Sequence, residues 1–132
     1  MSTAQLVAAT MLFVGSDVSP QAATASTGIK RTHLQRNDLG MAGYEAVHVR
    51  DDFDPGVTSG KHAHPGEGII CVLEGSLEYQ IEGRPPVTLK AGDVVFVPAG
   101  AIHTARNAGR SKAAELATYV VEKGKPLLTL AK

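Results

Sequence analysis

A chain of 132 residues is long enough for one domain with a self-sufficient hydrophobic core. Its 13 lysine and arginine residues balance its 13 aspartate and glutamate residues, so charge gives no reason to expect a nucleic acid or an anionic membrane as partner. The single cysteine excludes an intrachain disulfide and a C-x-x-C zinc site.

Residues 1–25 differ in composition from the rest of the chain. They contain no lysine or arginine, and an apolar run at 6–14 precedes small residues that end at Ala25. This order is typical of a secretory signal peptide, and the apolar run is too short to span a bilayer as a helix. We therefore expect cleavage before Ser26 and a periplasmic or secreted protein. Because the segment lacks the usual basic residue, the alternative is an N-terminal arm on a cytoplasmic protein, and in either case 26–132 is the folded domain.

Short apolar or alternating stretches, separated by glycine and proline, follow along the rest of the chain. Ser76–Glu82 alternates most clearly and predicts Leu77, Tyr79 and Ile81 on an inner face. Further strands are predicted at Ile29–Leu34, Tyr44–Arg50, around His62, Ile69–Leu73, Val87–Lys90, Val94–Val97, Ile102–Asn107, Ala114–Val121 and Leu127–Leu130. The segment 51–60 is predicted to be a turn. About eight short strands favour a closed β-barrel or jelly roll with room for one small ligand.

The strongest local pattern is the pair His62 and His64, which lies among glycines and prolines. On an extended segment, side chains two residues apart point to the same side. The flanking glycines and proline argue against a helix, on which the two rings would diverge. Two imidazoles that face one interior suit a divalent metal that prefers nitrogen ligands.

A second pattern places another histidine after a strand and a tight Pro/Gly turn. The first stretch fits G-x5-H-x-H with a later glycine, at Gly56, His62, His64 and Gly75. The second stretch fits G-x5-P-x-G-x2-H-x3-N without a gap, at Gly92, Pro98, Gly100, His103 and Asn107. Together the two stretches resemble the two motifs of the cupin superfamily, and the resemblance covers about Ile29 to Lys125.

The resemblance implies an all-β fold, a cupin β-barrel (a jelly-roll-like double-stranded β-helix) of the small single-domain type. It also implies that His62, His64 and His103 converge as ligands of one divalent transition metal. Iron, manganese, nickel, copper and zinc all suit three nitrogens, and the sequence does not choose among them. Barrels of this family are often dimers, so a homodimer is expected.

The chain departs from the family pattern at the position of the glutamate ligand. That glutamate belongs at position 68, where this chain has Gly68, and the nearest carboxylate is Glu67. A shift of one residue on a strand turns a side chain to the opposite face. We therefore expect Glu67 to point away from the histidines; the alternative is a bulge before Ile69 that brings Glu67 to the metal as a fourth ligand.

Two classes of function agree with this site. The first is a metal-dependent enzyme on a small organic substrate, resembling the dioxygenases, isomerases or decarboxylases of the superfamily, because three protein ligands leave open positions on the metal. The second is a non-catalytic periplasmic or secreted protein that binds a small ligand or a metal. No general base other than the site histidines stands out, so the sequence assigns no catalytic residue.

Overall fold

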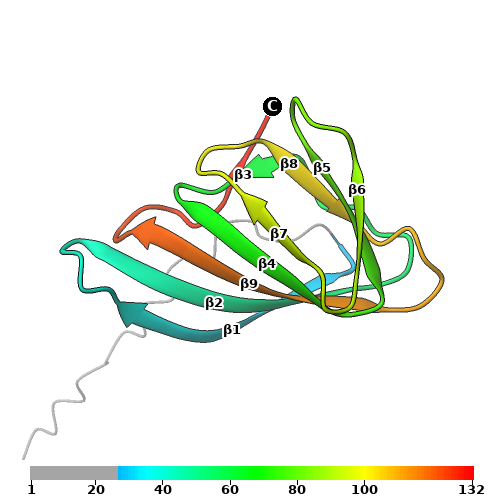
Figure 1. The fold of residues 1–132 in the computed structure, drawn as a ribbon, viewed down its shortest axis with the longest axis horizontal. Helices are drawn as coiled ribbons and strands as arrows, with labels where there is room; N and C mark the ends of the chain where they lie inside the picture. The colour runs from blue at the N-terminus through cyan, green and yellow to red at the C-terminus, as the bar shows by residue number, and fades with distance from the viewer. Residues whose placement is uncertain (1–26) are drawn as a thin grey trace, which may run out of the picture.

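All regular structure in residues 27–132, the part of the chain that the computed structural model describes, is β-strand (Figure 1). One sheet has the strand order β1-β2-β9-β4-β7 and the other the order β10-β3-β8-β5-β6. All strand pairs are antiparallel. The strands are β1 (Ile29–Asp38), β2 (Tyr44–Phe53), β3 (His62–Ala63), β4 (Glu67–Glu74), β5 (Ser76–Ile81), β6 (Val87–Lys90), β7 (Val94–Val97), β8 (His103–Arg106), β9 (Ala113–Glu122) and β10 (Thr129–Leu130). The predicted all-β fold is confirmed.

The hydrophobic core lies between the two sheets and follows the alternation of the sequence. Val47 and Val49 from β2 and Ala117 from β9 contribute from one sheet, and Leu77 and Tyr79 from β5 contribute from the other. The predicted inward face of β5 is confirmed, since Leu77 is fully buried and Tyr79 is 2% exposed. Each large apolar side chain buried in this way contributes about 1.5–3 kcal/mol to stability.

The prediction that the whole of 51–60 is a turn was wrong for its first three residues. Strand β2 continues to Phe53, and Asp51 keeps the inward parity of Val49 and Val47. An aspartate disfavours a strand locally. Here it is accommodated because Arg31 on β1 makes an ion pair with it at 2.7 Å.

Strand β1 is longer than predicted and pairs with β2 of the same chain. It runs from Ile29 to Asp38, with an irregular register between His33 and Gln35. This pairing brings Arg31 opposite Asp51. The edge strand therefore contributes a charged side chain to the interior of the barrel.

Asn107, at the end of the second motif, ties together the loops at one end of the barrel. It is 1% exposed, and its side-chain amide donates hydrogen bonds to the backbone carbonyls of Phe53, Asp54 and Ser111. Its carbonyl oxygen accepts a hydrogen bond from Gly109 N. Asn107 therefore stabilises these loops and is not part of the histidine cluster.

The predicted signal peptide at 1–25 lies outside the described residues. Within 27–132 there is no helix with the length and apolar character needed to cross a membrane.

Candidate metal centre

Three histidines meet inside the barrel, as the spacing of the two motifs predicts. His62 on β3 lies directly opposite His103 on β8, and His64 comes directly after the last residue of β3. One ligand nitrogen from each ring lies within 4.8 Å of those from the other two. The side chains are buried, with 7% of His62, 2% of His64 and 3% of His103 exposed. The cluster is therefore preformed and shielded from bulk water.

The hydrogen bonds of the three rings leave the same nitrogen of each ring available. Nδ1 of His62 donates to Gly60 O at 2.7 Å, Nδ1 of His64 to Leu127 O at 2.7 Å, and Nδ1 of His103 to Ala101 O at 2.9 Å. A carbonyl only accepts, so each Nδ1 carries the proton and each Nε2 carries a lone pair. A carbonyl partner for the second nitrogen is the usual way in which proteins orient a metal-binding histidine.

One of these nitrogens has no partner at all. Within 27–132, Nε2 of His64 is the only buried side-chain nitrogen or oxygen without a hydrogen bond. A buried polar atom without a partner costs about 1–3 kcal/mol. A bound cation would satisfy it, which makes the donor set fit a metal ion.

Burial and mutual repulsion keep the rings neutral. Burial, together with the charges that neighbouring rings would carry, lowers the pKa of His64 to about 3 and that of His103 to about 4. Burial also lowers the pKa of His62. At pH 7 the cluster therefore presents deprotonated nitrogens, the form that a metal binds.

Gly68 and Glu67 lie as strand parity predicts. Gly68 is buried on the inner face of β4, whereas Glu67 is exposed. The register of β4 with β7 and β9 is regular from Glu67 to Val72, so no bulge before Ile69 turns Glu67 inward.

Tyr119 on β9 fills the space beside Gly68. A Cβ atom at Gly68 would lie 3.2 Å from Cε1 of Tyr119, whose ring packs 4.3 Å from that of His64 between centroids. The tyrosine ring therefore lies where a side chain at position 68 would extend, and no carboxylate of residues 27–132 joins the three histidines.

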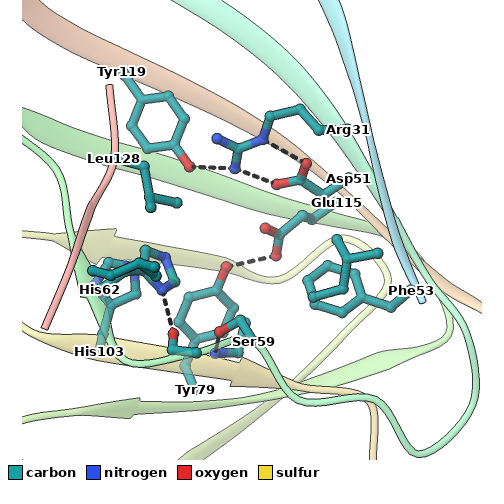
Figure 2. Close-up of a pocket in the computed structure, with 14 residues that line it drawn as sticks. Arg31, Asp51, Phe53, Ser59, His62, Tyr79, His103, Glu115, Tyr119 and Leu128 are labelled. Carbon is teal, nitrogen blue, oxygen red and sulfur yellow. Dashed lines mark hydrogen bonds and ion pairs between the residues drawn. The ribbon is translucent and has the colours of Figure 1, made fainter. Parts of the chain in front are cut away.

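A cavity of about 310 Å³ adjoins the histidine cluster (Figure 2). His62 and His103 form part of its wall, and Arg31, Asp51, Tyr79 and Glu115 form another part. Arg31 binds both carboxylate oxygens of Asp51, at 2.8 and 2.7 Å. The hydroxyl of Tyr79 donates to Glu115 at 2.6 Å. These four side chains form a polar wall, the carboxyl wall, which shares the cavity with the histidines.

The sequence profile of the cupin domain family matches residues 49–122, a stretch that holds all three histidines. This chain belongs to the cupin family.

Curated relatives differ in how much of their length the match covers. An oxalate-binding protein of Thermotoga maritima is 28% identical over 116 residues, which are 84% of this chain and 94% of that protein. The dimethylsulfoniopropionate lyase DddQ of Ruegeria pomeroyi is 45% identical over 49 residues, which are 37% of this chain but only 24% of the lyase.

Among solved structures, an uncharacterised double-stranded β-helix protein of Klebsiella pneumoniae is 26% identical, with a TM-score of 0.64. The match covers 82% of this chain and 88% of that one. The chain thus spans nearly the whole length of the Thermotoga and Klebsiella proteins, whereas its match to the lyase covers about a quarter of that protein.

The carboxyl wall of this cupin was not predicted from the sequence. Arg31 and Glu115 had no assigned role, and Asp51 was assigned to a turn. Strand parity held a usable signal, because Glu115 shares the inward parity of Ala117 and Tyr119 on an otherwise apolar face of the strand. A charged residue on the inner face of a predicted strand needs a partner, and is therefore a candidate for a site.

Proposed function

We propose that this cupin binds one divalent transition metal per chain through His62, His64 and His103. The observation that carries the proposal is Nε2 of His64, a buried lone pair without a hydrogen-bond partner in the described chain, in a cluster whose Nδ1 atoms are all engaged by carbonyls. Iron, manganese, nickel, copper and zinc all suit three neutral nitrogens. Glu67 is proposed not to be a ligand, because its side chain is exposed.

We propose further that the metal serves chemistry on a small organic substrate held in the adjoining cavity. A divalent metal with three protein ligands keeps open positions and supplies a Lewis acid or a site for dioxygen. His62 and His103 belong both to the cluster and to the cavity wall, so a molecule in the cavity lies next to the metal centre. This arrangement supports a dioxygenase, isomerase or decarboxylase type of reaction.

The second candidate function is non-catalytic binding of a small ligand. The similarity to the Thermotoga protein named for oxalate binding extends over nearly the whole of that relative. This similarity favours a self-contained barrel that binds a small carboxylate.

Metal analysis of protein made without added metal, followed by reloading with zinc or manganese, tests the metal centre. Wild-type protein is expected to take up about one ion per chain. The variant His62→Ala/His64→Ala is expected to take up none while it keeps the β-sheet circular dichroism of the wild type. His33→Ala is a matched control, because His33 is exposed on β1. Unchanged metal content in the double variant would refute the site.

A screen for dioxygen consumption with small carboxylic and carbonyl compounds separates the two functions. Turnover that requires His103 supports the enzyme. Saturable binding without turnover of any compound supports the binding protein.

We propose that this cupin is a homodimer that pairs through the outer face of β4 and β7. Ile69 lies opposite Phe96 on these strands, and Leu73 and Val94 extend the apolar surface. The exposed fractions of these four side chains are 43–58%. Exposed apolar patches of this kind are typical of protein interfaces. Light scattering is expected to give the mass of a dimer for wild type and of a monomer for Phe96→Lys.

We propose that residues 1–25 are a signal peptide and that the mature protein is periplasmic or secreted. The composition of the segment supports this proposal. When the full chain is expressed in a Gram-negative host, mass spectrometry of the periplasmic fraction is expected to find a chain that starts at Ser26. An intact chain in the cytosol would instead support the N-terminal arm of a cytoplasmic protein.

A further inference from the structure

We propose that Asp51 and Glu115 hold one proton between them, and that this proton allows the cavity to admit a small carboxylate beside the metal centre. The second half of this inference rests on the proposed metal-binding function. The first half rests only on the side chains of the cavity wall.

The two acids are direct neighbours across the barrel sheet. Asp51 on β2 is paired in register with Glu115 on β9. Both point inward, and each is 3% exposed. Side chains paired in this way have Cβ atoms about 4.5–5.5 Å apart, so the two carboxyl groups are within hydrogen-bonding reach. Neither side chain can reach bulk water while β2 and β9 remain paired.

The charged and titratable groups around Glu115 supply one cation for two acids. Arg31 from β1 forms a two-pronged ion pair with Asp51. Tyr79 from β5 donates its hydroxyl to Glu115, and Tyr119 on β9 is 3.4 Å from the Arg31 guanidinium. From β4, the residue paired with Glu115 is Val72, which is apolar. The charge of Arg31 balances Asp51, and within residues 27–132 no second cation pairs with Glu115.

Glu115 is therefore neutral in the folded protein. Burial, together with the neighbouring Asp51, raises the pKa of Glu115 to about 8 against the opposing effects of Tyr79 and Arg31. Burial also raises the pKa of Tyr79, so this phenol keeps its proton and remains a donor. Two buried acids that share a site commonly retain one proton in this way.

The proton sets the charge of the cavity and hence the ligand that it accepts. With Glu115 protonated, the polar wall has no net charge, and the histidines are neutral. A divalent metal then makes the cavity positive, which favours an anion. With Glu115 ionised, the wall would carry a negative charge next to the ligand and repel a carboxylate.

Infrared spectroscopy of the metal-free protein tests the first half. At about pH 6 wild type is expected to show the C=O stretching band of a buried protonated carboxyl group, and this band should disappear as pH rises past about 8. The band should be absent from Glu115→Gln. It should be present in the matched control Glu45→Gln, which alters another buried inward-facing glutamate of the same sheet, on β2. A band that is missing from wild type, or that persists in Glu115→Gln, overturns the inference.

A second variant tests the charge balance. Asp51→Asn leaves Arg31 as the cation for Glu115 alone, so Glu115 is expected to ionise and the band to be lost at about pH 6. If the band remains in a folded Asp51→Asn protein, Arg31 does not govern the proton and the shared-proton account is wrong.

Calorimetric titration of the zinc-loaded protein with oxalate tests the second half. For a ligand that requires the protonated form, the wild-type dissociation constant should rise roughly 30-fold between about pH 7 and pH 9.5. Glu115→Gln stays neutral and should bind oxalate as wild type does at about pH 7, with a much smaller rise. Equal pH profiles for the two proteins, or no oxalate binding by zinc-loaded wild type, overturn this half.

These readouts separate the inference from the proposed function. Glu115→Gln should keep the metal content of wild type, because Glu115 is not among the three clustered ligands. If wild type binds no metal, the proposed function fails while the infrared result still decides whether the proton is held.

Discussion

The histidine cluster and the carboxyl wall of the cavity both contain buried titratable groups, but the two regions become neutral through opposite proton changes. Both place titratable side chains where water is scarce, and in both burial favours the uncharged form. The histidines become neutral by losing a proton, since the pKa of His64 falls to about 3. The carboxyl wall becomes neutral by keeping one, since the pKa of Glu115 rises to about 8.

The two regions differ in whether they contain their own counter-charge. Arg31 lies inside the carboxyl wall and satisfies Asp51 with two hydrogen bonds. The histidine cluster contains donors only from its own Nδ1 atoms, which point to backbone carbonyls, and Nε2 of His64 lacks a partner in the described chain. The carboxyl wall therefore contains the cation that it needs, whereas the histidine cluster has a free lone pair that a cation from solution would satisfy.

The largest effect is expected from removing the internal cation. Arg31→Met leaves two buried acids without a positive charge, and breaking a buried pair in this way costs about 3–5 kcal/mol. Urea denaturation at about pH 7 measures the loss. The control is Arg50→Met, because Arg50 and its partner Asp52 are 39% and 37% exposed and their pair contributes little. Equal losses in the two variants would show that the Arg31 pair is not structurally important.

Acid is expected to destabilise the metal-free protein through the histidines. Their folded pKa values lie below the ordinary 6.5, at about 3 for His64 and about 4 for His103, so the unfolded chain binds more protons below pH 6.5. The stability that they contribute is complete above about pH 6.5 and is lost as pH falls toward the folded values. At about pH 5 the loss is about 2 kcal/mol for each of these histidines.

Denaturation of metal-free protein at about pH 7 and pH 5 checks this expectation. His33→Ala should keep the full acid sensitivity, because His33 is exposed. His64→Gln should lose part of it. An acid sensitivity that His64→Gln leaves intact would assign the effect to other groups.

Alkali is expected to act on the carboxyl wall in the opposite direction. The folded pKa of Glu115 is raised to about 8 from 4.5, so the folded state binds more protons between these values and stability falls as pH rises through them. Glu115→Gln does not titrate, so the difference in unfolding free energy between this variant and wild type should shift in favour of the variant by about 4 kcal/mol between about pH 5 and pH 9. Thermal unfolding at these two pH values measures the shift, with Glu45→Gln as control. A constant difference between wild type and Glu115→Gln would contradict the raised pKa.

The smallest effect concerns the missing motif glutamate. Gly68→Glu alone should change zinc affinity little, because its Cβ would lie 3.2 Å from Tyr119 Cε1 and the ring blocks the path to the metal. Gly68→Glu combined with Tyr119→Ala should tighten zinc binding by roughly tenfold over Tyr119→Ala, or about 1.4 kcal/mol. Competition with a chelator measures both. Glu67→Gln should leave the affinity unchanged, and a loss of zinc in that variant would show that Glu67 reaches the metal.

Several features of this cupin follow from local signals in the sequence. Alternation predicted the inward face of β5, and the two-residue spacing of His62 and His64 predicted two imidazoles on one side of the chain. Parity alone placed Gly68 inward and Glu67 outward. These features follow from the two-residue period of a strand, which needs no knowledge of neighbouring strands.

What lies opposite each of these residues depends on how the strands pair in the folded barrel. Arg31, Asp51 and Glu115 are far apart in the chain and meet because β1, β2 and β9 are adjacent in one sheet. Asp51 was assigned to a turn because an aspartate disfavours a strand, and the ion pair that outweighs this preference comes from another strand. Tyr119 fills the space beside Gly68 for the same reason, since the register between β4 and β9 pairs them directly. Strand pairing over long sequence separations is set by the packing of the whole barrel, so strand parity could mark Glu115 as inward-facing but could not reveal that Asp51 and Arg31 lie beside it.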